Sequence, residues 1–205
     1  MQSTRYSLFP TLIWESRLQA DLVRMINRLI LEQMQELRRT LPSLTAGESW
    51  QSGNRMQDAT ALQPLLQVLD IAAKDMLRAL RIGQDDLRVT GCWLNLNARG
   101  AGHRMHSHPN NFLSGVYYVR TGEGADTINF HDPRVQAGVI KPPVTELAAG
   151  NTDQVVLRVE EGMLLLFPSW LQHSVDPNRG DIERVSVSFN LMFASYVDSM
   201  SPPLW

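Results

Sequence analysis

The chain has little cysteine, no long hydrophobic run and no excess of either charge. Its single cysteine, Cys92, rules out a disulfide framework, and its apolar surroundings predict a small buried hydrophobe rather than a nucleophile. No stretch approaches the roughly 20 apolar residues that a membrane-spanning helix needs. Residues Met1 to Pro10 lack the basic head and apolar segment of a secretory signal. We therefore expect a cytoplasmic protein without a membrane segment.

The charge balance also excludes a class of partner. The 19 Lys and Arg residues nearly match the 21 Asp and Glu residues, and the formal net charge is -2. Because no basic field is present to attract a phosphate backbone, nucleic-acid binding is not expected. The length of 205 residues and the 43% hydrophobic content are ordinary for a globular protein, and we expect a single domain.

The first part of the chain, residues 1–83, has the pattern of a strand followed by two helices. Tyr6 to Trp14 predicts a short edge strand that is interrupted at Pro10. Apolar residues recur at threes and fours in Leu18 to Leu37 and again in Leu65 to Leu80, which predicts two amphipathic helices. The polar stretch Thr40 to Gln57 separates them. We expect this part to pack on the outer face of the domain core, within the same domain.

In residues 84–205 the hydrophobic period changes from 3.6 to 2, which predicts a β-rich core. Short segments punctuated by glycine, proline and asparagine indicate a barrel or sandwich, and a long insertion without a clear element runs from Pro133 to Asn151. The expected strands are Leu87 to Asn97, Arg104 to His108, Phe112 to Arg120, Asp126 to His131, Asp153 to Val159, Gly162 to Phe167 and Glu183 to Phe193.

Three of the five histidines, at positions 103, 106 and 108, lie within six residues. Alternate residues of a strand share a face, so His106 and His108 are expected to point the same way and to bind a metal ion. Imidazole suits iron, zinc, copper and nickel, and the pair does not choose among them. His103 falls on the opposite face in this pattern, and we expect it to be a solvated loop residue.

A third histidine and an arginine occur further along the chain. His173 follows the apolar strand Gly162 to Phe167 at the point where another strand begins, and could complete a three-point site. Arg184, Ser186 and Ser188 alternate with apolar residues on the next strand, so inside a barrel they would form a polar pocket wall. An arginine beside a hydroxyl group is a good binding site for a carboxylate.

The order and spacing of these residues resemble a known family. The histidine pair, the aromatic strand Ser114 to Val119, the block Phe130 to Arg134, and then His173 and Arg184 are similar to the small 2-oxoglutarate- and Fe(II)-dependent oxygenases of bacteria and phages. The resemblance implies a mainly β fold, a double-stranded β-helix or jelly roll, with iron at its open end. It also implies that the distal carboxylate of 2-oxoglutarate is received by Arg184 and Ser186, with a hydroxyl from Tyr117 or Tyr118.

One position departs from the wider superfamily, in which the second ligand is usually an aspartate or glutamate two residues after the first histidine. Here that position is His108. Three neutral imidazoles leave the full double charge on the ion, which favours a dianionic co-substrate and leaves open whether the metal is iron. Asp132 ranks second to His108 as a ligand, because its place in an Asp-Pro-Arg turn has an ample structural explanation.

The family resemblance implies a reaction but no substrate. Decarboxylation of 2-oxoglutarate to succinate would be coupled to oxidation of a small molecule or a peptide. Trp93, Asn95 and Trp170 are expected to line the pocket. The apolar ends, Phe193 to Tyr196 and Pro202 to Trp205, could serve a homodimer contact.

Two other functions fit the same pattern. A cupin-type metalloenzyme would use three histidines without 2-oxoglutarate. A non-catalytic jelly-roll binding module would hold the histidines in hydrogen bonds to water and carbonyl groups. Arg184 discriminates the first, because only 2-oxoglutarate turnover requires it, and metal binding discriminates the second.

Overall fold

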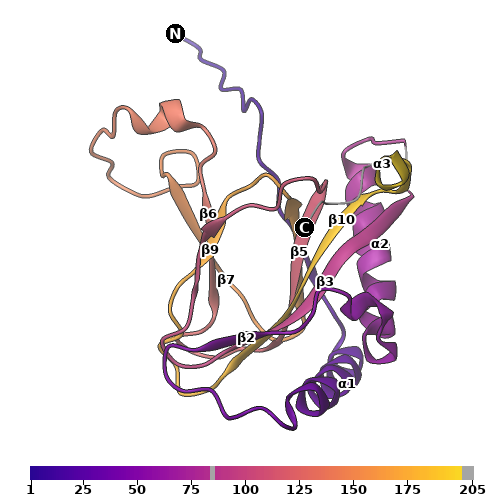
Figure 1. Cartoon of the computed structure of the whole chain (residues 1–205). Helices are drawn as coiled ribbons and strands as arrows, with labels where there is room; N and C mark the ends of the chain where they lie inside the picture. The colour runs from indigo at the N-terminus through magenta and orange to yellow at the C-terminus, as the bar shows by residue number, and fades with distance from the viewer. Residues whose placement is uncertain (84–85, 200–205) are drawn as a thin grey trace.

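Two antiparallel β-sheets face each other in the computed structural model, which describes residues 1–83 and 86–199 (Figure 1). The larger sheet has six strands in the order β1-β8-β5-β10-β3-β2, and the smaller has four in the order β4-β9-β6-β7. From β3 to β6 and from β7 to β10 the chain alternates between the sheets, which is the connectivity of a jelly roll. The strands are β1 Trp14–Arg17, β2 Ser49–Gln51, β3 Leu87–Asn97, β4 His103–His106, β5 Leu113–Arg120, β6 Thr127–His131, β7 Gln154–Arg158, β8 Met163–Pro168, β9 His173–Val175 and β10 Arg184–Phe193.

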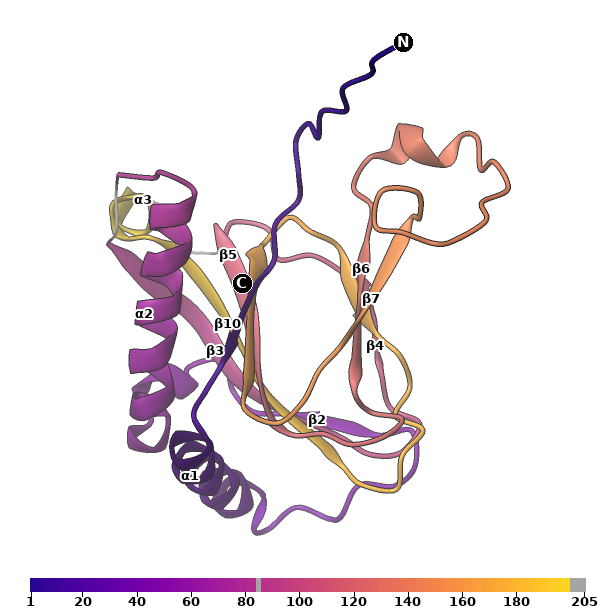
Figure 2. The ribbon, with the colours of Figure 1, turned by 180° about the vertical axis from the view of Figure 1, so that it is seen from behind.

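Two long helices, α1 Ala20–Arg38 and α2 Gln63–Ala79, cover the outer face of the six-stranded sheet (Figures 1 and 2). Their apolar faces, which include Ile26 and Leu69, form one core with the outward residues of the sheet. The 3.6-residue period therefore buries one stripe of each helix, as expected from the sequence. The remaining helices are short: η1 Met56–Asp58, η2 Thr60–Leu62, η3 Val135–Gly138 and α3 Ala194–Ser199.

A second core fills the space between the two sheets. Because neighbouring strand residues point to opposite faces, Tyr117 belongs to the core under the helices and Tyr118 to the core between the sheets. The same alternation along β10 sends Val185 and Val187 toward the helices, and leaves Arg184 and Ser186 on the inner face. The inner face is thus where polar side chains of the large sheet collect.

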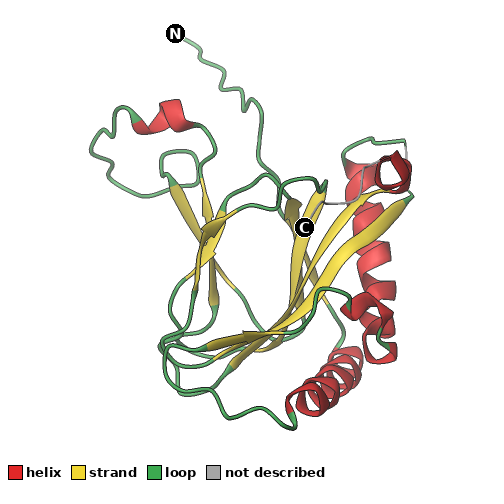
Figure 3. Cartoon of the chain, viewed as in Figure 1, coloured by secondary structure: helices red, strands yellow, loops and turns green. Residues whose placement is uncertain are grey.

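The structure contains the expected strands with ends shifted by at most a few residues, and both long helices (Figure 3). The predicted edge strand within Tyr6 to Trp14 was misplaced, since β1 begins only at Trp14 and pairs with β8. Strand β2, which lies in the expected polar loop, was not predicted, and β9, which holds His173, was expected only as the beginning of a strand. The long insertion after β6 is a loop that contains η3, and extends away from the sheets (Figure 1).

Two apolar segments near residue 200 were named in the sequence analysis as candidates for a homodimer contact. Phe193 to Tyr196 ends β10 and begins α3, whereas Pro202 to Trp205 lies outside the described residues. No helix in residues 1–83 and 86–199 is both long and apolar enough to cross a membrane.

Candidate metal centre

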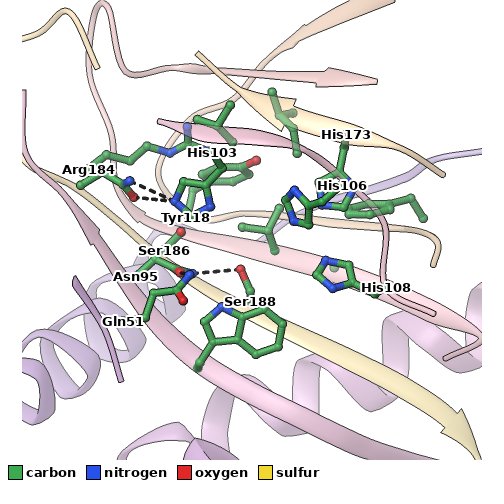
Figure 4. A pocket seen from close by; sticks show the side chains of 17 residues that line it. Gln51, Asn95, His103, His106, His108, Tyr118, His173, Arg184, Ser186 and Ser188 are labelled. Atoms are coloured by element: carbon green, nitrogen blue, oxygen red, sulfur yellow. Dashed lines mark hydrogen bonds between the residues drawn. The ribbon is translucent and has the colours of Figure 1, made fainter. Parts of the chain in front are cut away.

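The side chains of His106, His108 and His173 converge in the space between the two sheets (Figure 4). One nitrogen from each ring can be chosen so that all three lie within 4.8 Å of one another. His106 and His173 are direct partners across β4 and β9, while His108 follows the end of β4 and is held there by a 2.9 Å hydrogen bond from its backbone N–H to the carbonyl oxygen of Ser169. The three imidazoles thus form a group that could hold one metal ion.

Two of these rings are oriented by the backbone. Nδ1 of His106 lies 2.7 Å from the carbonyl oxygen of Arg104, and Nδ1 of His173 lies 3.0 Å from that of Leu171. A carbonyl oxygen only accepts hydrogen bonds, so each Nδ1 carries the proton and each Nε2 keeps a free lone pair. Histidines that bind metals commonly have this outer partner, which fixes the tautomer and the ring orientation.

The surroundings keep two of the candidate ligands, His108 and His173, neutral. Burial lowers the pKa of His173 to about 4, with the neighbouring His106 and His108 adding to the effect. Burial and the proximity of His106 lower the pKa of His108 to about 4 as well. Metals bind the deprotonated imidazole, so both rings are in the binding form at neutral pH.

Asp132, the second-ranked ligand in the sequence analysis, does not join this group. Its carboxylate accepts hydrogen bonds from Arg134, whose Nε lies 2.9 Å and Nη2 2.7 Å away. These hydrogen bonds lower the pKa of the Asp132 carboxyl group. The structure therefore gives Asp132 the turn role that its Asp-Pro-Arg context suggested, and no carboxylate from residues 1–83 or 86–199 joins the metal group.

A buried arginine lies in the same pocket as the histidines. Arg184 is 4% exposed, and it forms no ion pair with an acidic side chain in the described part of the chain. Its Nη1 donates to the carbonyl oxygen of Thr127 at 3.2 Å, and its guanidinium carbon lies 5.2 Å from the centre of the Tyr118 ring. A buried cation without an anion is costly, so this guanidinium has an unmet need for a negative partner.

The hydroxyl group of Tyr118 is also buried and donates to no acceptor among the described residues, with the guanidinium of Arg184 close enough to interact with its oxygen. Burial raises the pKa of Tyr118 to about 12, with Arg184 acting in the opposite direction. The phenol therefore stays protonated at neutral pH and is available as a donor. Orphaned donors beside an unpaired arginine fit a carboxylate ligand.

Most of the residues predicted for the site line this pocket, among them Trp93, Asn95 and Ser186. The amide of Asn95 donates to the Ser188 hydroxyl at 3.0 Å and accepts from Gln51 Nε2 at 2.8 Å, so it forms an ordered polar wall. The pocket is lined by Gln51, Trp93, Asn95, Asn97, His103, His106, His108, Gly115, Val116, Tyr118, Ile128, Phe167, His173, Val175, Arg184, Ser186 and Ser188.

Two predicted residues lie elsewhere. The hydroxyl group of Tyr117 donates to Asn27 Oδ1 on α1 at 2.8 Å, in the core under the helices, because Tyr117 faces the opposite side of β5 from Tyr118. Trp170 is 56% exposed and does not line the pocket. It lies in the turn between β8 and β9, where it is free to face solvent.

The sequence analysis also placed His103 wrongly. We expected a solvated loop residue on the face away from His106, but both side chains line the pocket. The pairing of β4 with β9 shifts register between His103 and His106. Two residues of β4, Arg104 and Met105, therefore lie opposite a single residue of β9, Ser174. This β-bulge turns His103 inward, and strict alternation cannot reveal it.

Comparison with known proteins agrees with this geometry. Residues 91–190 match the model of a family described as "Putative 2OG-Fe(II) oxygenase". This segment runs from β3 to β10 and includes all three metal-site histidines and Arg184. No curated protein matches the chain.

Solved structures with the same fold are numerous and distant in sequence. The non-heme alpha-ketoglutarate-dependent epimerase SnoN from nogalamycin biosynthesis is 14% identical, with a TM-score of 0.64 over 94% of this chain and 88% of that chain. A Pseudomonas putida prolyl-4-hydroxylase is 18% identical, with a TM-score of 0.60 over 89% and 93%. HygX from Streptomyces hygroscopicus, solved with nickel and 2-oxoglutarate, is 11% identical, with a TM-score of 0.61 over 90% and 83%.

Proposed function

The chain belongs to the 2OG-Fe(II) oxygenase family through residues 91–190, and from that premise we propose that His106, His108 and His173 bind Fe(II) while Arg184 binds 2-oxoglutarate. The chain is a 2-oxoglutarate-dependent oxygenase that uses Fe(II). Our proposal assigns the parts of that activity to particular side chains.

The observation that carries the assignment is Arg184, a buried guanidinium that pairs with no described acidic residue and lies in the same pocket as three clustered imidazoles. A dicarboxylate with a 2-oxo group fits both ends of this pocket. Its 2-oxo and adjacent carboxylate oxygens suit a metal ion at the histidines, and its distal carboxylate suits the arginine. Neutralising a buried cation and saturating its donors should contribute strongly to affinity.

The charges in the pocket also suit such a ligand. Three neutral imidazoles leave a divalent ion with its full charge, and Arg184 adds one more positive charge. A dianion that spans both groups is therefore favoured over a neutral ligand of the same size. Ser186 and Tyr118 supply hydroxyl donors at the arginine end.

When bound, Fe(II) supplies the activation of dioxygen that couples decarboxylation of 2-oxoglutarate to oxidation of the substrate. His106, His108 and His173 would hold the ion. Val116, Ile128 and Phe167 provide an apolar wall that limits the entry of water. Asn95, held by Gln51 and Ser188, presents a fixed amide to the ligand.

The substrate is proposed to be a small molecule or a peptide that reaches the pocket past Trp93, whose ring lies 5.9 Å from that of His108. A cytoplasmic site of action is part of this proposal, because the chain has one cysteine, Cys92, and it is buried.

Anaerobic titration tests the proposal. Protein loaded with Fe(II) should develop a weak visible charge-transfer band when 2-oxoglutarate is added, and exposure to dioxygen should then yield succinate. Iron binding without any response to 2-oxoglutarate would favour a three-histidine metalloenzyme of the cupin type. Failure to bind metal would favour a binding module without catalytic activity.

A further inference from the structure

The β-bulge in β4 places a fourth histidine in the pocket, and it lies apart from the metal group. In Figure 4, His103 is on the side of Arg184, while His106, His108 and His173 are together on the other side. A bulge disrupts the ladder of a strand and is commonly found where a side chain has to be redirected beside an active site. Here the redirected side chain is that of His103.

The backbone is built closely around this placement. At Gly102, immediately before His103, an added Cβ would lie 2.6 Å from the carbonyl oxygen of Val175 and 3.0 Å from the backbone nitrogen of Pro177. Only glycine allows the chain to pass so near. The entry to β4 is thereby fixed against the loop after β9, and His103 is directed inward.

The imidazole of His103 is held from one side by an amide. Its Nε2 lies 3.0 Å from Asn97 Nδ2 and 3.3 Å from Asn97 Oδ1. We assign the hydrogen bond to the shorter contact, in which the amide N–H donates to Nε2; with this assignment the ring proton is on Nδ1. No described residue accepts a hydrogen bond from that Nδ1.

The charge on His103 matters for its role. Burial, reinforced by the neighbouring Arg184 and His106, lowers the pKa of His103 to about 4. The ring is therefore neutral at physiological pH, and it can donate a hydrogen bond without adding a second positive charge beside the guanidinium.

We propose that His103 binds the distal carboxylate of 2-oxoglutarate together with Arg184, donating a hydrogen bond from Nδ1, and that Asn97 is the positioning residue that fixes its tautomer. This inference rests on the proposed function, since it assigns a further residue to the same co-substrate. It adds a neutral hydrogen-bond donor to a carboxylate-binding site for which the sequence analysis named only Arg184, Ser186 and a tyrosine hydroxyl.

The two amide side chains that imitate opposite ends of an imidazole provide the test. The amide nitrogen of asparagine can occupy the place of Nδ1 and donate, whereas the amide oxygen of glutamine can occupy the place of Nε2 and accept from Asn97. His103→Asn should therefore keep the donor to the carboxylate and lose the contact with Asn97. His103→Gln should keep the contact with Asn97 and lose the donor, and His103→Leu should lose both.

The measurement is the calorimetric dissociation constant of 2-oxoglutarate for each full-length variant, loaded with Fe(II) in the absence of oxygen. We expect His103→Gln and His103→Leu to bind 2-oxoglutarate about 10-fold more weakly or worse, and His103→Asn to stay within about threefold of the wild type. Oxalate, which offers two chelating oxygens but no distal carboxylate, should bind all the variants equally. Equal oxalate and Fe(II) affinity also shows that each variant is folded around its metal site.

The inference is overturned if His103→Asn is impaired as much as His103→Gln, or if no variant is impaired. It is also overturned if His103→Gln binds normally and His103→Asn does not, because the ring would then act only through Asn97. Arg184→Met, measured in parallel, separates this inference from the proposed function. If Arg184→Met retains full affinity for 2-oxoglutarate, the proposed function itself fails, whatever the His103 variants show.

Discussion

The imidazoles of His106 and His173 face each other across neighbouring strands, with ring centres 4.3 Å apart. Each donates its Nδ1 proton to a carbonyl oxygen of its own chain segment, so both rings are fixed by the same backbone that forms the sheet. His108 lies beyond the end of β4 and makes the third contact from a loop. Two ligand positions are therefore built into the strand pairing of β4 and β9 before any metal binds.

Replacing His106 should remove metal binding. We expect His106→Ala to lose more Fe(II) affinity than the roughly 10- to 100-fold that loss of an outer hydrogen-bond partner costs. His131→Ala is the matched control, because His131 lies outside the metal group, with its Nε2 2.9 Å from the hydroxyl oxygen of Ser174. Metal content after anaerobic loading and desalting measures both. Equal losses in the two variants would contradict the assignment.

Replacing Arg184 should separate co-substrate binding from metal binding. Arg184→Met should weaken 2-oxoglutarate binding about 100-fold, because it removes one partner of a buried charge pair. Fe(II) affinity should not change. The ligand-free variant should be at least as stable as the wild type in urea, since it no longer buries an unpaired cation. Arg158→Met is the control, because Arg158 pairs with Asp126 and its side chain is 81% exposed. A clear loss of stability in ligand-free Arg184→Met would indicate an unrecognised partner.

The sequence alone predicted most of the helices and strands and most of the site, and two of its errors at the site share a cause. Alternation along a strand placed Arg184 and Ser186 on one wall. It also grouped His106 with His108, which do meet, although β4 ends at His106 and His108 follows it in a loop. It failed at His103, because a β-bulge shifts the face of every residue before it and leaves no mark in a hydrophobic pattern. Register is decided by contacts between distant strands.

For the same reason, the sequence could not decide which of two adjacent tyrosines faces the pocket. Both Tyr117 and Tyr118 are fully buried, so burial does not distinguish the tyrosine that faces the pocket from the one that faces the helices. Only the packing of α1 against β5, where Asn27 receives the hydroxyl group of Tyr117, shows which one faces the helices. The short strand β2 escaped prediction for a different reason: it is Ser-Trp-Gln, too short and too polar to produce a periodic signal.

The stability of the metal-free protein should fall as the pH falls from about 6.5 to about 4. The pKa values of His103, His108 and His173 are each lowered from 6.5 to about 4 in the folded state, mainly by burial. Between these values the unfolded chain binds more protons than the folded chain, so acid favours unfolding. Each histidine contributes at most about 1.4 kcal/mol per pH unit to the slope.

Urea unfolding of the metal-free protein at several pH values measures this slope. A variant with both His103→Gln and His108→Gln should show a shallower dependence, because two of the three titrating groups are removed. Stability that stays constant or rises on acidification across this range would mean that the rings are not buried as neutral groups.

Gly102→Ala should disturb the site through the backbone alone. The added methyl group would lie 2.6 Å from the carbonyl oxygen of Val175, so the start of β4 has to shift. We expect a loss of about 1 to 3 kcal/mol in the free energy of unfolding, as for other overpacked positions. Binding of 2-oxoglutarate should weaken with it, because His103 moves. Gly53→Ala is the control, since no atom lies within 4 Å of the added Cβ there. Normal stability of Gly102→Ala would contradict this account of the bulge.

The adjacent tyrosines offer the sharpest pair of substitutions. Tyr117→Phe should cost about 1 to 3 kcal/mol of stability, because it leaves Oδ1 of the buried Asn27 without its donor, and should not affect 2-oxoglutarate binding. Tyr118→Phe should do the reverse: in the ligand-free protein its hydroxyl group donates to no described residue, so stability should hold, while 2-oxoglutarate affinity should fall about 10-fold. Urea unfolding measures the stability of both variants, and calorimetry measures their affinity for 2-oxoglutarate. If Tyr118→Phe binds 2-oxoglutarate normally, the phenol does not face the carboxylate, and the ligand lies elsewhere in the pocket.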